Sequence, residues 1–117
     1  MARQGRLAEE FACRFLQRRG LELLARNYYC RRGEIDLVMN DSGCIVFVEV
    51  RYRGNPRFGT AAETVDRRKQ ARLIAAAQHY LQRHRAAAGA PCRFDVISVS
   101  PASSAQPLQW IRDAFQL

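Results

Sequence analysis

The feature that most constrains this chain is a predicted β-hairpin with carboxylates inside its apolar runs. Its sequence, GEIDLVMNDSGCIVFVEVRYR, spans residues 33–53. The first strand alternates between two faces, with Ile35, Leu37 and Met39 on one and Glu34, Asp36 and Val38 on the other. Residues 40–43 are turn formers, and residues 44–52 are strongly β-prone. Ionised groups are seldom placed beside a core without a partner, so these acids require an explanation.

The spacing of two of these acids indicates a divalent metal site. If residues 40–43 form a four-residue turn, Asp36 faces Phe47 and has Glu49 as its diagonal neighbour across the hairpin. Diagonal neighbours have Cβ atoms ~7–8 Å apart, which is too far for direct contact. The separation suits two carboxylates that bind one cation through Mg–O bonds of ~2.1 Å. We therefore expect Mg²⁺ or Mn²⁺ at Asp36 and Glu49.

The charge pattern fits a metal site that acts on a polyanion. The net charge is +8, but residues 33–50 carry four acids and no base. This acidic segment lies between the arginine-rich residues 1–32 and residues 51–93, which carry ten bases and two acids. Basic segments attract phosphates, and the acids would hold the cation. The alternative is an ordinary solvated basic surface.

The periodicity predicts an α/β fold with a mixed β-sheet flanked by helices, in the order α-β-β-β-α-β and within a single domain, residues 1–117. Apolar residues recur at helical spacing in two segments, and β-prone runs lie between and after them. The expected helices are residues 5–19 and 66–84; the expected strands are 22–30, 34–39, 44–52 and 92–99, and residues 108–115 form a closing strand or helix.

Two residues on the predicted helices point toward the hairpin. Glu9 lies at the edge of an apolar arc, whereas Glu10 lies nearly opposite that arc and should be in water. Asp66 is a plausible N-cap, which makes Lys69 the N3 residue, one turn before Leu73 on the buried stripe. Lys69 is the only lysine among nineteen basic residues, which suggests that its chemistry is required there. The alternatives are a boundary glutamate paired with an arginine and a snorkelling lysine.

Other arginines offer phosphate contacts. Arg67, Arg68 and Arg72 point away from the buried stripe of the second helix. The loop over residues 53–60 is basic and contains two Gly and one Pro. A solvated helix face and a plain connector are the respective alternatives.

Several classes are excluded. Cys13, Cys30, Cys44 and Cys92 form no CxxC pair, which argues against a zinc ribbon or a disulfide framework and favours reduced thiols in a cytoplasmic protein. No apolar run approaches the ~20 residues that span a membrane. The chain has no P-loop and no dinucleotide-binding glycine pattern.

The order of these residues resembles a known family. The pattern D-x12-E-x-R at Asp36, Glu49 and Arg51 resembles the PD-(D/E)xK nuclease signature. A longer set of motifs resembles the bacterial YraN family: G-x3-E-x2-A from Gly5, RN at 26–27, GEIDLV at 33–38, VFVEVRYR at 46–53, FG at 58–59, K-x3-L from Lys69 and RFDV at 93–96.

This resemblance implies a restriction-endonuclease-like core in a cytoplasmic bacterial protein, with a role in DNA processing akin to that of archaeal Holliday-junction resolvases. It implies that Asp36 and Glu49 are the metal ligands. The implied catalytic residues are Glu9, Asp36, Glu49, Arg51 and Lys69. The candidate nucleic-acid-binding residues are Arg26, Asn27, Arg53, Arg57, Arg67, Arg68 and Arg72. Asp95 could instead be structural, holding an arginine.

One departure from the family pattern matters. The terminal Lys of the signature is Arg51 here. Arginine clamps a phosphate but stays protonated, so it cannot serve as a base. Three hypotheses follow, in decreasing order: a metal-dependent endonuclease acting on DNA, a nucleic-acid-binding module without turnover, and an adaptor for an acidic protein. Branched DNA would favour a homodimer with two sites, although the sequence identifies no dimer surface.

Overall fold

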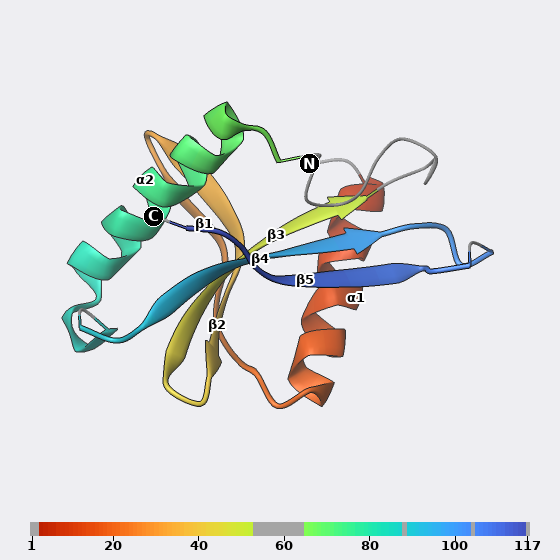
Figure 1. The fold of residues 1–117 in the computed structure, drawn as a ribbon, viewed down its shortest axis with the longest axis horizontal. Helices are drawn as coiled ribbons and strands as arrows, with labels where there is room; N and C mark the ends of the chain where they lie inside the picture. Colours follow the sequence, from red (N-terminus) through yellow and green to blue (C-terminus); the bar gives the residue numbers. More distant parts are fainter. Residues whose placement is uncertain (1–2, 53–64, 88, 104, 117) are drawn as a thin grey trace.

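The computed structural model describes residues 3–52, 65–87, 89–103 and 105–116 of the chain (Figure 1). The helices and strands follow one another in the predicted order, and residues 108–115 form a fifth strand. The elements are α1 (Arg3–Arg18), β1 (Glu22–Cys30), β2 (Gly33–Asp41), β3 (Cys44–Tyr52), α2 (Arg67–Arg83), the 3-10 helix η2 (Arg85–Ala87), β4 (Cys92–Val99) and β5 (Leu108–Phe115). Among the helices in the described part of the chain, none is long and apolar enough to cross a membrane.

The five strands form one mixed sheet in the order β1-β2-β3-β4-β5. Neighbouring strands are antiparallel except β3 and β4, which run parallel because α2 lies in the crossover between them. The predicted α/β class, with a mixed sheet flanked by helices, is confirmed. The difference from the predicted order is the closing strand β5.

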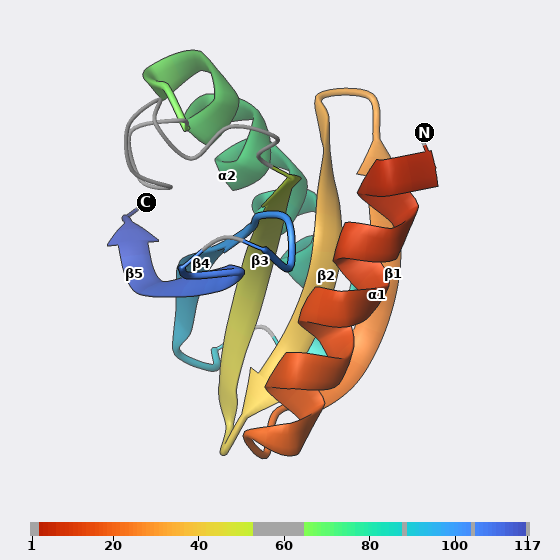
Figure 2. The ribbon, with the colours of Figure 1, turned by 90° about the vertical axis from the view of Figure 1, so that its right-hand side faces the viewer.

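Each helix covers one face of the sheet (Figures 1 and 2). Side chains of α1 pack on one face with Leu37, Met39, Val46, Val48 and Ile97. Side chains of α2 pack on the other face with Ile35, Val38, Phe47, Phe94 and Val96. Full burial of each large apolar side chain contributes roughly 1.5–3 kcal/mol, so these two layers hold both helices against the central strands.

The turn of the hairpin corrects the predicted register. Ser42 and Gly43 form a two-residue loop with positive φ angles of 52° and 96°, and Asp41 pairs with Cys44. Positive φ at both loop positions is the pattern of a tight hairpin turn. The prediction of a four-residue turn was therefore wrong, because Asn40 and Asp41 belong to the strand although they are turn formers. Phe47 consequently faces Val38 instead of Asp36.

Strand alternation also breaks beside the predicted site. Ile35 packs in the same core layer as Val38, whereas Leu37 packs in the opposite layer. The regular alternation of side chains between the two faces of β2 is therefore interrupted at Asp36. The prediction that Ile35, Leu37 and Met39 share one face was wrong. On β1, Asn27 adopts a left-handed conformation with a φ of 49° next to this break. Asn tolerates this conformation better than most residues, which lets β1 follow the distortion.

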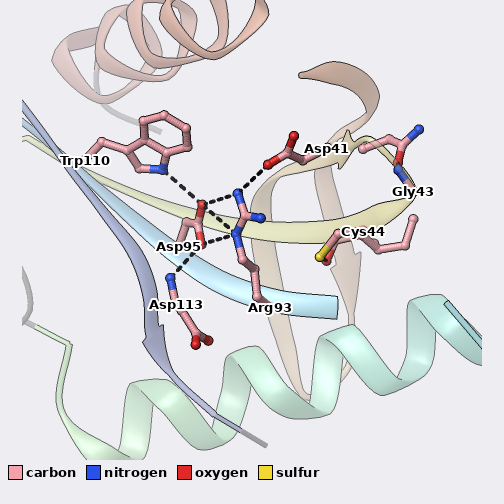
Figure 3. A network of polar contacts seen from close by, with 9 residues as sticks. Asp41, Gly43, Cys44, Arg93, Asp95, Trp110 and Asp113 are labelled. Carbon is pink, nitrogen blue, oxygen red and sulfur yellow. Dashed lines mark hydrogen bonds and ion pairs between the residues drawn. The ribbon is translucent and has the colours of Figure 1, made fainter. Parts of the chain in front are cut away.

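A buried ion pair ties β4 to β5 and to the hairpin (Figure 3). The Asp95 side chain is 0% exposed and accepts hydrogen bonds from Arg93, from Trp110 Nε1 at 2.9 Å and from the Asp113 backbone N–H at 2.9 Å. Arg93 also pairs with Asp41 at 3.0 Å. Although burial lowers the pKa of Arg93, its bonds to Asp95 and Asp41 raise that pKa above its ordinary value. The structural role considered for Asp95 is confirmed.

Candidate active site

The predicted site residues meet in one pocket where β2 and β3 separate. The pairing of these two strands ends at Leu37 and Val48, and the next residues along are Asp36 and Glu49. The pocket has a volume of about 430 Å³. Its walls include all five predicted catalytic residues: Glu9, Asp36, Glu49, Arg51 and Lys69.

Asp36 and Glu49 face each other across the separating strands. One more step of the observed register places them directly opposite, closer than the predicted diagonal arrangement. The Asp36 carboxylate accepts a hydrogen bond from the Val50 backbone N–H at 2.8 Å. A side chain thus satisfies a backbone donor at the point where the β2–β3 pairing stops.

The two carboxylates share a site that is short of positive charge. Burial, followed by the charge of Glu49 and a hydrogen bond with it, raises the pKa of Asp36 to about 9. Glu49 is itself buried, with 4% of its surface exposed. Like charges held this close disfavour double ionisation, so a cation bound between them would be stabilising.

Glu9 adds a third acid from α1. It is 7% exposed, and its pKa is raised first by burial and then by the charges of Glu34 and Glu49. A hydrogen bond with Asn27 and the charge of Arg26 act in the opposite direction. The predicted position of Glu9 facing the sheet is confirmed. The alternative, a boundary glutamate paired with an arginine, finds only the charge of Arg26 nearby, because the hydrogen bond of Glu9 is with Asn27.

Two cations converge on one oxygen of Glu49. Lys69 Nζ lies 3.3 Å from Glu49 Oε2, and Arg51 Nη1 lies 3.4 Å from the same atom. Lys69 is held there by the start of α2, because the Asp66 side chain caps the helix by accepting from the Lys69 backbone N–H at 2.8 Å. The predicted N-cap is confirmed. Lys69 therefore lies at the position from which an ammonium group can contact an anion in the pocket.

The donor set suits a hard divalent cation. Carboxylate oxygens are the ligands that Mg²⁺ and Mn²⁺ prefer, and Mg²⁺ is commonly held by one or two carboxylates plus substrate phosphates. Asp36 and Glu49 supply two such groups in a pocket whose lining has four acids and two bases. Within the described residues, no group of three or more His, Cys, Asp or Glu side chains is arranged to hold a metal. Any cation here would depend on these two carboxylates together with substrate or water oxygens.

The predicted nucleic-acid contacts fall into three groups. Arg26 and Asn27 turn toward α1, where Arg26 Nη2 lies 3.5 Å from Cys13 Sγ and Asn27 bonds to Glu9. Arg67, Arg68 and Arg72 are exposed on the first turns of α2. The remaining two, Arg53 and Arg57, lie outside the described residues.

A basic groove adjoins the pocket and was not predicted. It has a volume of about 330 Å³ and is lined by Arg31, Arg32 and Arg72, and it shares Glu34 and Lys69 with the pocket. The β1–β2 turn lies against α2 here, since a Cβ on Gly33 would lie 2.5 Å from the Arg72 carbonyl oxygen. The sequence signal for this groove was the pair of arginines directly before Gly33. It was missed because Arg-Arg-Gly is typical of an ordinary turn.

Comparison with known proteins identifies the family. The family model described as "Uncharacterised protein family UPF0102" matches residues 8–99. A UPF0102 protein of Nitrosococcus oceani is 54% identical over 114 residues, which cover 97% of this chain and 92% of that protein. A UPF0102 protein of Pseudomonas savastanoi pv. phaseolicola is 54% identical over 112 residues, covering 95% and 91% respectively. The chain therefore belongs to the uncharacterised family UPF0102, the YraN family that its motifs resemble.

Proposed function

We propose that this chain is a divalent-cation-dependent endonuclease that hydrolyses phosphodiester bonds in DNA. One observation carries the proposal: Asp36 and Glu49 face each other where β2 and β3 separate, and two cationic side chains reach the same Glu49 oxygen. Buried acids with raised pKa values in a pocket are characteristic of functional sites. The PD-(D/E)xK resemblance supports the same chemistry.

Each residue has a distinct role in this proposal. Asp36 and Glu49 would hold Mg²⁺ or Mn²⁺, which when bound would draw charge from a phosphate oxygen and make a nearby water more acidic. Lys69 and Arg51 would neutralise the negative charge that develops on the phosphate oxygens during attack. Arg51 cannot take a proton from water, since its guanidinium stays protonated. Glu9 would orient the attacking water from the α1 side of the pocket.

The surface around the pocket supports a polyanionic substrate. The net charge of +8 favours phosphate-rich partners, and Arg31, Arg32 and Arg72 line the groove that opens from the pocket. Four acids in the hairpin would repel phosphate unless a cation intervened, which favours a metal-dependent reaction over simple binding. The four cysteines are free thiols, in keeping with the expected cytoplasmic location.

A nucleic-acid-binding module without turnover is the second candidate. The observation that favours it is Arg51 in the position of the lysine of the signature. If the reaction needs a neutral amine, only Lys69 can supply one.

A cleavage panel tests the proposal. Wild type and Asp36→Ala/Glu49→Ala would be incubated with linear, single-stranded, flapped and four-way DNA, in Mg²⁺, Mn²⁺ or EDTA. The matched control is Glu10→Ala/Glu22→Ala, which also removes two acids but from outside the pocket. We expect wild type and control to cleave at least one substrate, and EDTA or the site variant to abolish cleavage.

Either of two results would contradict the nuclease. One is cleavage by the site variant at the wild-type rate, which would indicate a contaminant. The other is the absence of cleavage by folded wild type in every metal while DNA still shifts at low salt, which would favour the binding module.

A further inference from the structure

An uncharged groove lies beside the candidate active site. It has a volume of about 430 Å³ and is lined by nine residues, of which none is ionisable except Tyr52. Three of its large apolar side chains are solvent-exposed: Leu7 by 57%, Phe11 by 47% and Tyr52 by 40%. The chain has a net charge of +8, but no arginine or lysine lines this groove. The groove is therefore unsuited to phosphate.

This groove is continuous with the pocket. Ala8 and Tyr52 line both, whereas the basic groove joins the pocket through Glu34 and Lys69. An uncharged aromatic groove and a basic groove thus open from different walls of one site. A nucleotide has the same two parts, an anionic phosphate and an uncharged planar base.

We propose that the Phe11–Tyr52 groove binds an unpaired nucleobase next to the phosphate being cleaved. The inference rests on the proposed nuclease function for the position of that phosphate. Bases stack on exposed aromatic side chains largely without regard to sequence. The volume also falls within the range of small-molecule sites, ~300–1,000 Å³.

A base-binding groove would favour one class of substrate, DNA with unpaired bases. A base within a duplex is stacked and paired, so it could enter only if it were first extruded. Single strands, flaps and junctions supply unpaired bases at no such cost. We expect preference for DNA with unpaired nucleotides at the cleavage position.

Binding in EDTA at low salt tests this inference without requiring cleavage, since the arginines of the basic groove attract phosphates even when the acids hold no cation. The probe is a single-stranded oligonucleotide that contains 2-aminopurine, a fluorescent base that is quenched when it stacks. Phe11→Leu removes the ring and keeps an apolar side chain, so the folded protein should survive. The control is Leu24→Ala, since Leu24 is 40% exposed and lies outside the groove.

We expect wild type to quench 2-aminopurine and to bind the single strand more tightly than the matching duplex. Phe11→Leu should weaken single-strand binding roughly five- to tenfold, the lower part of the range for loss of one stacked base, and should reduce quenching. Leu24→Ala should change neither. An oligonucleotide with abasic sites should bind wild type and Phe11→Leu alike.

Three results would overturn the inference. These are equal affinity for single strand and duplex, equal binding by wild type and Phe11→Leu, and a wild-type dimer that Phe11→Leu converts to monomer with unchanged DNA affinity. The last would show that a second copy covers the groove. If only the proposed nuclease function is wrong, the result is different: wild type quenches 2-aminopurine but cleaves no DNA substrate in the cleavage panel.

Discussion

Asp95 and Asp36 are both carboxylates placed inside the same sheet, but the charges around them differ. Asp95 is fully buried beside the Arg93 guanidinium and also accepts from Trp110 and the Asp113 backbone (Figure 3). Asp36 accepts one backbone hydrogen bond, from Val50, and its side-chain neighbour is another acid, Glu49.

This difference separates an acid that holds the fold from acids available for chemistry. A buried charge is tolerated when it is paired and hydrogen-bonded, and Asp95 meets both conditions. At Asp36 the hydrogen bond from Val50 offsets only part of the cost of burial, so burial and the charge of Glu49 raise the pKa of its carboxyl. In the proposed function, a bound divalent cation would supply the missing positive charge at Asp36.

The largest expected effect is on stability, at Asp95. Asp95→Asn leaves the Arg93 guanidinium without its buried partner, so we expect a loss of about 3–5 kcal/mol in the free energy of unfolding. Urea denaturation would measure it. Asp113→Asn is the matched control, because Asp113 donates to Asp95 through its backbone, and it should change stability by less than about 0.5 kcal/mol. A small change in stability for Asp95→Asn would contradict the structural role of Asp95 in this comparison.

Lys69 should have the next largest effect, and on activity. Lys69→Met removes the ammonium group 3.3 Å from Glu49, so we expect cleavage to slow by roughly 100-fold at unchanged stability. Single-turnover rates would measure the change, with Arg83→Met at the far end of α2 as the control. Arg51→Lys should stay within a few-fold of wild type if Lys69 fills the lysine role. Strong activation by Arg51→Lys would assign that role to position 51 instead.

Asp36→Asn should act on stability in the opposite direction to Asp95→Asn. A pKa raised to about 9 in the folded chain means that Asp36 favours folding fully below about pH 3.8, and this contribution is lost as the pH rises through 9. In EDTA at pH 8 the Asn variant should therefore be more stable than wild type, by about 1–3 kcal/mol. The advantage should shrink toward pH 4.5, as urea denaturation at both pH values would show. A variant less stable than wild type at pH 8 would mean that the Asp36 charge is compensated.

The smallest expected effects are on Mn²⁺ binding, and they should differ between the neighbouring residues Glu9 and Glu10. Glu9 is buried and faces the pocket, whereas Glu10 is half-exposed and pairs with Arg14 at 3.0 Å. Glu9→Gln should weaken Mn²⁺ binding severalfold, and Glu10→Gln should leave it unchanged. Loss of the exposed Glu10 pair should cost less than about 0.5 kcal/mol. Equal effects on Mn²⁺ binding would indicate only a general change in surface charge.

Much of the fold was predictable because local patterns decide it. Three of the predicted strands have the observed bounds, and Asp66 caps α2 as its side-chain chemistry requires. The closing strand β5 was ambiguous, since residues 108–115 are too few and too mixed for either period to dominate. The hairpin register was missed because four consecutive turn formers do not reveal which two make the turn.

The candidate site was predictable as a set of residues more than as a geometry. The spacing of the motifs brought Glu9, Asp36, Glu49, Arg51 and Lys69 together, and one pocket contains them all. The break in alternation at Asp36 arises from the separation of β2 and β3, which is a property of the whole sheet. The two grooves form where distant segments meet, such as α1 and the residues after β4. They could not be predicted because no local sequence pattern indicates which distant segments come together.

The most direct test of the acid pair is a calorimetric titration with Mn²⁺ at pH 7.5. Wild type, Asp36→Asn and the control Asp113→Asn would be compared at equal concentration and confirmed to be folded. We predict binding by wild type and the control, and at least tenfold weaker binding by Asp36→Asn. Equal binding by all three, or none by folded wild type, would contradict the assignment of Asp36 and Glu49 as a cation site.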